Sequence, residues 1–237
     1  MHILPIIPAR FESERFPGKL LKRYCGPTVI SWPIAACLAA FQQCFVLTDN
    51  TELAEEASAH DADALLIEGD YRNGTERIAD ACNRLNVDDD TLIMHVQGDE
   101  VGLIPEDLKR LAQVVMDRHE VGTLFYRTDD EKLLKSLDHV KCWRGQILKA
   151  ADGVLVSCGE SWRFSRARNV PTHEEGQGFI HVGVYCYRRS LLHGYMARWP
   201  TDDEKCERLE QLRWDVPIIA YEVAPCKSIN VPEDLEH

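Results

Sequence analysis

The first half of the chain alternates short apolar runs with segments of helical character. The apolar runs have the length and composition of buried strands, and each is followed by a helix-forming stretch. Strands connected in this way pair in parallel, and their helices cover both faces of the sheet. The sequence therefore predicts an α/β fold with a doubly wound, mainly parallel sheet. The predicted strands are residues 3–8, 44–48, 62–67 and 91–96, and the predicted helices lie near 28–41, 51–59, 75–86 and 105–118.

Two features modify this pattern. Pro5 lies in the first predicted strand, where proline would remove a backbone donor, so we expect it at the start of that strand. After about residue 121 the segments are typical of antiparallel strands, which extend one edge of the sheet or build a small lobe. These segments are residues 122–127, 145–151, 153–158 and 178–188, followed by a charged amphipathic helix at 202–214 and a late strand at 216–223.

Charge and composition exclude several classes of function. The chain has 237 residues, of which 45% are apolar, and its formal net charge of −12 argues against general binding to nucleic acids or anionic membranes. No apolar run approaches the roughly 18 residues needed for a membrane span, and the N-terminus lacks the features of a signal peptide. Nine cysteines without a C-x-x-C pair indicate reduced thiols in a cytoplasmic protein, rather than disulfides or a zinc site.

A basic loop follows the first predicted strand of this acidic chain. Residues 8–19 read PARFESERFPGK, and the cations Arg10, Arg15, Lys19 and Lys22 surround a Pro-Gly pair. The carboxyl end of a first strand is where an open α/β sheet binds ligands, and Arg and Lys form charge-assisted hydrogen bonds to phosphate. The loop therefore predicts a polyanion site, and the alternative is a solvated surface loop.

Two further motifs carry residues that suit a nucleotide or a metal. In HVQGDE, residues 95–100, an apolar strand ends near Asp99, whose carboxylate could bind Mg²⁺ or merely cap a turn. In NGTERIAD, residues 73–80, amides, a hydroxyl and a guanidinium at a helix start could hold a base edge or a phosphate. An ordinary capped helix would have the same pattern.

Together, the three motifs resemble those of the CMP-Kdo synthetases, the cytidylyltransferases that activate 3-deoxy-manno-octulosonate (Kdo). The resemblance covers most of the chain, and the matching segments occur in the family's order. IIPARFESERFPGKLL is similar to the family's nucleotide loop. The other matching segments are LTDN (47–50), NGTERIAD, HVQGDE, VKCW (140–143), FSRARNVP (164–171), HVGVYCYRR (181–189), RLEQLRW (208–214) and VPEDLE (231–236).

The resemblance implies a nucleotide-diphospho-sugar transferase-like fold and a single cytidylyltransferase domain, residues 1–237. Within it, 1–121 would bind nucleotide, 122–205 would form a mixed antiparallel segment for sugar binding and dimerisation, and 206–237 would return to the main sheet. The implied reaction converts CTP and a 3-deoxy-ulosonic acid, most directly Kdo, into CMP-sugar and pyrophosphate, with Mg²⁺ as cofactor. The implied protein is a cytoplasmic homodimer that serves lipopolysaccharide biosynthesis and binds neither nucleic acid nor membrane.

Individual roles carry over at the matching positions. Lys19, Arg10 and Asp99 would act in catalysis, with Lys19 neutralising charge at the α-phosphate and the departing pyrophosphate. Arg166 would pair with the sugar carboxylate. The other implied contacts are Arg10, Ser13, Arg15 and Lys19 to the triphosphate, Gly74, Thr75 and Arg77 to cytidine, Gln97 at the sugar–nucleotide junction, His181, Tyr185, Glu210 and Gln211 to sugar hydroxyls, and Asp99 to Mg²⁺.

Without the resemblance, two of these residues have ordinary explanations. His181 in an apolar strand is typical of a core histidine with its hydrogen bonds satisfied, and Glu210 is typical of a solvated charge on a helix. Tyr185 lies at even spacing from His181, so the two side chains are predicted to share one strand face.

The chain departs from the family pattern at the second metal ligand. The family's G-V-D-T-P-E-D is replaced by SINVPED, so Asn230 stands where the second metal-binding carboxylate is expected. An amide offers an oxygen without charge, which predicts weaker or altered Mg²⁺ binding. Val101 likewise replaces the family's proline after QGDE. Two alternatives therefore stay open: the same chemistry on an amino-ulosonic or sialic-acid-like sugar, and a catalytically impaired nucleotide-binding homologue.

Overall fold

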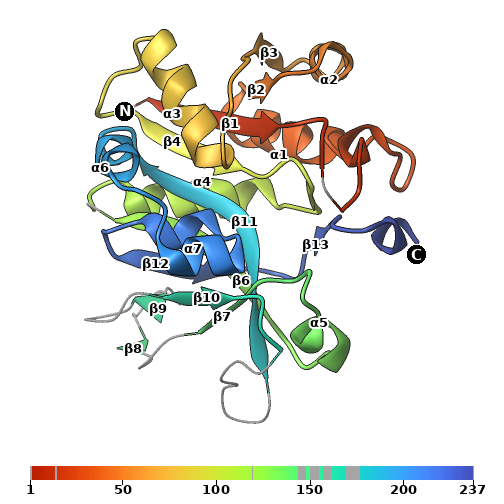
Figure 1. The fold of residues 1–237 in the computed structure, drawn as a ribbon, viewed down its shortest axis with the longest axis vertical. Helices are drawn as coiled ribbons and strands as arrows, with labels where there is room; N and C mark the ends of the chain where they lie inside the picture. The colour runs from red at the N-terminus through yellow and green to blue at the C-terminus, as the bar shows by residue number, and fades with distance from the viewer. Residues whose placement is uncertain are drawn as a thin grey trace.

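One mixed sheet forms the centre of the molecule (Figure 1). It is seen in a computed structural model that describes residues 2–13, 15–118, 120–143, 148–149, 155–156, 162–168 and 177–236. Four of its strands are parallel and lie in the order β4–β1–β2–β3, which confirms the strands predicted in the first half of the chain. They are β1 (Ile3–Ala9), β2 (Phe45–Thr48), β3 (Asp63–Leu66) and β4 (Leu92–Val96).

Pro5 lies inside β1, so the prediction that it begins the strand is wrong. β1 pairs with β4 from Ile3 onwards but with β2 only from Ile6. The carbonyl of Ile3 faces the β2 side, where it accepts a hydrogen bond from Gln43 Nε2 at 2.7 Å. Pro5, two residues further on, faces the same side before the β1–β2 ladder begins. The sheet therefore tolerates the missing N–H at this position.

The antiparallel strand β11 (Gly178–Arg188) connects the parallel strands to the rest of the sheet. It pairs with β4 and β7 along one edge and with β6 along the other, and β12 adds a parallel pair beyond β6. The strands predicted at 122–127, 178–188 and 216–223 are thereby confirmed, whereas most of 145–151 and 153–158 lies outside the described residues. The later strands are β5 (Glu100–Val101), β6 (Val121–Thr128), β7 (Lys141–Trp143), β8 (Leu148–Lys149), β9 (Leu155–Val156), β10 (Arg163–Ser165), β12 (Ile218–Glu222) and β13 (Lys227–Ser228).

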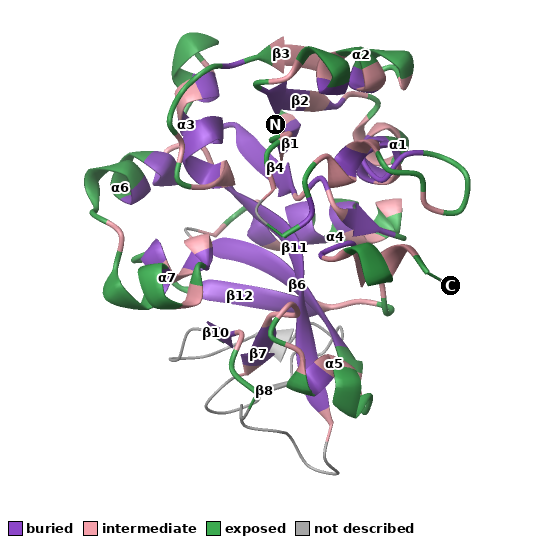
Figure 2. Ribbon diagram, turned by 45° about the vertical axis from the view of Figure 1, so that its right-hand side comes forward, coloured by how far each residue is buried: buried purple, intermediate pink, exposed green. Residues whose placement is uncertain are grey.

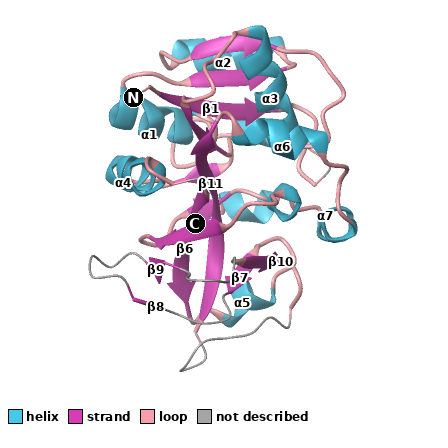
Figure 3. Ribbon diagram, turned by 90° about the vertical axis from the view of Figure 1, so that its left-hand side faces the viewer, coloured by secondary structure: helices cyan, strands magenta, loops and turns pink. Residues whose placement is uncertain are grey.

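Helices cover both faces of the sheet, as the doubly wound prediction requires. Figure 3 shows α1 and α4 on one side and α3 and α6 on the other, and the strands between them are buried (Figure 2). In β1, Ile7 packs into the core on the α1 and α4 side, while Leu4 and Ile6 pack into the core on the α3 side. None of the described helices is long and apolar enough to cross a membrane. The helices are α1 (Ser31–Phe41), α2 (Thr51–Ala59), α3 (Gly74–Arg84), α4 (Pro105–Val115), α5 (Glu131–Lys135), α6 (Leu191–Ala197), α7 (Asp202–Glu207) and the 3₁₀ helices η1 (Lys19–Leu21), η3 (Glu210–Arg213) and η4 (Pro232–Leu235).

The prediction of a single helix at 202–214 is wrong, because this segment forms two separate helices, α7 and η3. Arg208 ends α7 in a left-handed conformation with φ of 55°. The break allows Arg213 of η3 to turn back towards two buried carboxylates. Its guanidinium donates to Glu204 of α7, from Nε at 2.7 Å, and to Glu76 of α3 at 2.8 Å. This ion cluster ties three elements together beside the start of α3.

Replacing Arg213 by Met should destabilise the fold strongly. The substitution leaves buried Glu204 without its counter-charge and leaves Glu76 only the longer pair with Arg72 at 3.5 Å, and breaking such a cluster typically costs about 3–5 kcal/mol. Urea unfolding measures the loss. The matched control is Arg198→Met, which removes a half-exposed ion pair with Asp215 (2.6 Å) and should cost less than about 1 kcal/mol. Equal losses in the two variants would contradict the structural role of Arg213.

Candidate active site

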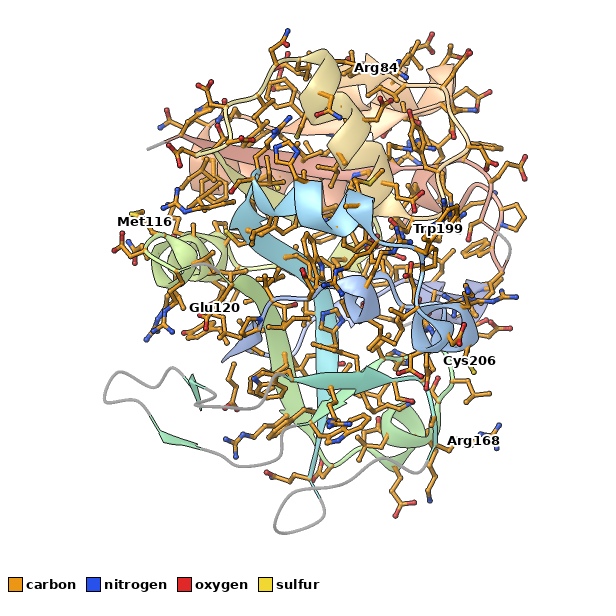
Figure 4. The ribbon with its side chains drawn as sticks, turned by 60° about the vertical axis from the view of Figure 1, so that its left-hand side comes forward. Arg84, Met116, Glu120, Arg168, Trp199 and Cys206 are labelled. Carbon is orange, nitrogen blue, oxygen red and sulfur yellow. The ribbon has the colours of Figure 1, made fainter. Side chains whose placement is uncertain are left out.

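A cavity of about 990 Å³ opens at the carboxyl ends of β1 and β4. Fourteen of the fifteen residues that the sequence analysis assigned to substrates or metal line it, and Thr75 does not. Trp199, labelled above Cys206 of α7 in Figure 4, also belongs to the lining. The fourteen residues are Arg10, Ser13, Arg15, Lys19, Gly74, Arg77, Gln97, Asp99, Arg166, His181, Tyr185, Glu210, Gln211 and Asn230.

The basic loop is fixed to the far end of the chain through Lys19. Gly18 has a φ of 66°, which glycine adopts readily, and it lets the chain turn so that Lys19 begins η1. The Lys19 ammonium forms an ion pair with Asp99 and donates to the carbonyl of Ile229 at 3.0 Å. The Ile229 amide in turn donates to the Asp99 carbonyl at 3.0 Å. Lys19, which is predicted to bind the triphosphate, is therefore in direct contact with Asp99, which is predicted to bind the metal ion.

Arg15 bridges two walls of the cavity. One of its nitrogens donates to Asp138 Oδ1 at 2.5 Å and the other to Asn230 Oδ1 at 3.3 Å. The side chains of Arg15 and Asp138 are 41% and 36% exposed. Partly exposed ion pairs contribute little net free energy, so an incoming phosphate can compete with Asp138 for Arg15.

The start of α3 approaches β1 closely through Gly74. A Cβ atom on Gly74 would lie 2.8 Å from Pro8, so only glycine fits without displacement. Arg77, one turn later, is buried, and its guanidinium donates to the Ala9 carbonyl at 3.1 Å and to Asp49 at 2.6 Å. Although Arg77 lines the cavity, most of its hydrogen-bonding capacity is thus used to hold the ends of β1 and β2.

Glu210 organises neighbouring groups in the cavity. It accepts one hydrogen bond from the Thr75 amide at 2.8 Å and another from Gln97 Nε2 at 2.7 Å. The side chain of Thr75 is buried beneath the cavity surface, so its part in the site is this amide. Because each carboxylate oxygen of Glu210 accepts one of these hydrogen bonds, Glu210 caps the start of α3 and orients Gln97.

Gln211 differs from Glu210, because its Nε2 atom is buried and has no hydrogen-bond partner among the described residues. A buried amide donor without an acceptor costs free energy. Gln211 lines the cavity, although its Nε2 atom is itself enclosed by protein.

His181 and Tyr185 share a face of β11, as predicted, although the strand has an irregularity between them. His181 lies opposite Phe125 of β6 and Tyr185 opposite Thr123, so both partners are on one face as well. The two rings have centroids 5.4 Å apart. Thr123 Oγ1 hydrogen-bonds His181 Nε2 at 2.9 Å, and burial lowers the pKa of His181 to about 3. The imidazole is therefore neutral at physiological pH.

Arg166 approaches the cavity from the end of β10. Its Nη1 donates to the carbonyls of Leu137 and Asp138, at 3.4 and 2.9 Å, and its backbone amide donates to Glu207 at 2.8 Å. Burial lowers the pKa of the guanidinium from its usual range. Residues 169–171 of the same motif lie outside the described residues.

The sequence analysis missed Glu100, a buried carboxylate in the cavity wall. It accepts hydrogen bonds from the Gly183 amide at 2.7 Å and from Ser228 Oγ at 2.8 Å. Burial and, secondarily, the neighbouring charge of Asp99 raise the pKa of Glu100 to about 8. The only signal in the sequence was a second acid after Asp99, and its partners come from strands more than 80 residues away.

Comparisons with known proteins show the family of the chain. The model of the cytidylyltransferase family matches residues 4–223. The 3-deoxy-manno-octulosonate cytidylyltransferase of Pseudomonas syringae pv. syringae (strain B728a) is 31% identical over 245 residues, covering 98% of this chain and 94% of the relative. The chain belongs to the 3-deoxy-manno-octulosonate cytidylyltransferase family. The enzyme of the same name from Legionella pneumophila (strain Lens) is 32% identical, covering 97% of this chain and 92% of the relative.

Solved structures show the same fold as this cytidylyltransferase. The structure of CMP:2-keto-3-deoxy-manno-octonic acid synthetase complexed with CTP matches with a TM-score of 0.79 and 26% identity, covering 100% of this chain and 96% of that chain. A cytidylyltransferase from Leptospira borgpetersenii serovar Hardjo-bovis (strain JB197) matches with a TM-score of 0.62 at 17% identity, which shows the fold alone; 100% of this chain and 84% of that one are covered.

His181 should remain neutral between pH 8 and pH 5. Its pKa is about 3 in the folded protein and near 6.5 in the unfolded chain, so the unfolded chain binds more protons between these values. The stability that His181 contributes is therefore complete above pH 6.5 and is lost as the pH falls towards 3. Imidazole ¹⁵N chemical shifts measure its protonation, and His181→Gln assigns the signal. A titration midpoint near 6.5 would contradict the burial argument.

Proposed function

We propose that this cytidylyltransferase transfers CMP from CTP to Kdo, releasing pyrophosphate. The observation that supports this most is that the basic loop, Asp99 and the wall around Arg166 line one and the same cavity. Phosphate-binding cations at one end and a guanidinium with hydroxyl-binding groups at the other suit a nucleoside triphosphate beside a sugar acid. The relatives' names favour Kdo over amino-ulosonic or sialic-acid-like sugars. From the family resemblance we further propose a cytoplasmic homodimer that serves lipopolysaccharide biosynthesis.

The reaction is an in-line displacement in which the anomeric hydroxyl of the sugar attacks the α-phosphorus. Such a step needs orientation and charge neutralisation rather than a covalent nucleophile. Arg10 and Arg15 bind the triphosphate, and Arg15 leaves Asp138 to do so. Lys19 neutralises the charge that develops on the departing pyrophosphate.

The sugar is held by groups of different chemistry. Arg166 pairs with the carboxylate, a role that the neutral His181 cannot fill. His181 and Gln211 hydrogen-bond hydroxyl groups, and Gln97, held by Glu210, lies between sugar and nucleotide. These contacts orient the anomeric hydroxyl and exclude water, which would otherwise compete as the nucleophile.

Mg²⁺, which the family resemblance implies, fits the donors next to Lys19. Asp99 supplies a carboxylate and Asn230 an amide oxygen, and both line the cavity. No cluster of three or more His, Cys, Asp or Glu side chains in the described part of the chain could hold a metal ion. Mg²⁺ is commonly held by one or two carboxylates together with substrate phosphates, so the triphosphate would supply further ligands. When bound, the ion would neutralise charge on the phosphates.

The proposed function is tested by pyrophosphate release from the wild type with Mg²⁺, each of the four nucleoside triphosphates and a panel of ulosonic acids. CTP with Kdo should react fastest. Lys19→Ala should lower the rate by about 10²–10³-fold, the usual effect of losing a preorganised transition-state donor. Lys22→Ala is the matched control, because Lys22 lies outside the cavity lining. Equal rates with ATP and CTP, or equal rates in the two lysine variants, would refute the proposal.

Asn230→Asp should lower the Mg²⁺ concentration needed for half-maximal activity. The added carboxylate attracts the ion, by about three- to tenfold for an interaction near 1 kcal/mol. Asn230→Leu, of similar size but without an oxygen, should raise the Mg²⁺ requirement. Titrations at saturating CTP compare the three proteins, and superimposable curves would place residue 230 outside the metal's ligands.

A further inference from the structure

Lys141 is a fully buried lysine that belongs to none of the substrate contacts described above. It lies on β7 opposite Ile180 of β11, and Ile180 lines the cavity. Paired residues on neighbouring strands project to the same face. The Lys141 side chain therefore shares the face of Ile180 and does not itself line the cavity, but its ammonium contacts the cavity wall through the carbonyls of His139 and Arg166, two residues that do line it.

The Lys141 ammonium binds backbone carbonyls instead of a carboxylate. It donates to the carbonyls of Ser136, His139 and Arg166, at 2.5, 2.9 and 2.8 Å. An ammonium has three N–H donors, and all three are used. A buried charge is tolerated only with such compensation, so these three carbonyls are held at definite positions.

Arg166 completes the arrangement from the other direction. Its Nη1 donates to the carbonyls of Leu137 and Asp138, the two residues between those bound by Lys141. Four consecutive carbonyls, from residues 136–139, are thus bound by two cations. Nη1 makes both hydrogen bonds of the guanidinium to described residues, so Nε and Nη2 are left for a ligand.

We propose that Lys141 is a positioning residue for recognition of the sugar carboxylate. It holds the loop 136–139 and the backbone of Arg166 together, so that the guanidinium is presented to the cavity at a fixed angle. Without Lys141, Arg166 keeps its amide contact with Glu207 but loses the carbonyl contact and the rigid loop on which Nη1 rests. This inference rests on the proposed function, because it assigns Arg166 to the sugar acid.

A double-mutant cycle tests whether Lys141 acts through Arg166. Lys141→Met removes all three donors at similar length and should raise the KM for Kdo by about 10–100-fold, since small misplacements of a positioning group have effects of this size. The Kd for CTP should change less than about threefold. Arg166→Ala should also raise the KM for Kdo, and the double variant should be no worse than Arg166→Ala alone. Lys135→Met, on the exposed face of α5, is the matched control and should behave as wild type.

The outcomes separate the two proposals. If the wild type releases no pyrophosphate with any ulosonic acid, the proposed function and the inference both fail. If the wild type is active but Lys141→Met leaves the KM for Kdo unchanged, or the two substitutions have independent, additive effects, the inference alone is overturned.

A second measurement applies if Lys141→Met does not fold. Burial lowers the pKa of Lys141 to about 8, with Arg166 lowering it further and Glu207 and Asp138 opposing; His139 lies in the bound loop. As the pH rises through about 8, the neutral amine retains two donors and one carbonyl loses its partner. The KM of the wild type for Kdo should then rise, whereas that of Arg166→Ala should not. A flat profile in the wild type would overturn the inference.

Discussion

The backbone hydrogen bonds of β11 are the interaction on which the site depends. This strand pairs with β4 of the parallel unit, with β6, and with β7, so it fixes the position of the parallel strands relative to β6 and β7. Its irregularity places the Gly183 amide against Glu100, and the Gly183 carbonyl accepts from the Gln97 amide at 2.8 Å. An added Cβ on Gly183 would lie 2.7 Å from each of these two side chains. The hydrogen bond between the backbones of Gln97 and Gly183 therefore positions Gln97, the residue predicted to lie at the sugar–nucleotide junction.

Several charged side chains around the cavity bind backbone groups. Arg77 binds the carbonyl at the end of β1, Glu210 an amide at the start of α3, Glu100 an amide of β11, and Lys141 three carbonyls. Backbone groups at the ends of strands and helices point outward and need partners. When a charged side chain is the hydrogen-bond partner of such a backbone group, the side chain and the loop hold each other in place. Loops that form much of the site are made rigid in this way.

The charged side chains proposed to bind substrate differ from those that bind the backbone. Lys19 and Asp99 are paired, and Arg15 is shared between Asp138 and Asn230, all at the surface of the cavity. A phosphate can replace Asp138 at Arg15 at little cost, because that ion pair is partly exposed. The protein thus keeps a concentrated positive site within a chain of net charge −12.

The sequence by itself determined the parallel strands and their helices, and fourteen of the fifteen residues that it assigned to substrates or metal line the cavity. The periodicity of apolar residues indicates which residues are buried, and the order of the motifs indicates the family. Only the tertiary structure decided that the helix predicted at 202–214 is divided at Arg208 and that Pro5 lies inside β1. It also decided which groups the buried charges contact, as Glu100 and Lys141 show. Glu100 binds the Gly183 amide, and Lys141 binds three carbonyls; both therefore contact backbone atoms, which every residue type possesses. No pattern of side chains in a sequence can therefore reveal such contacts.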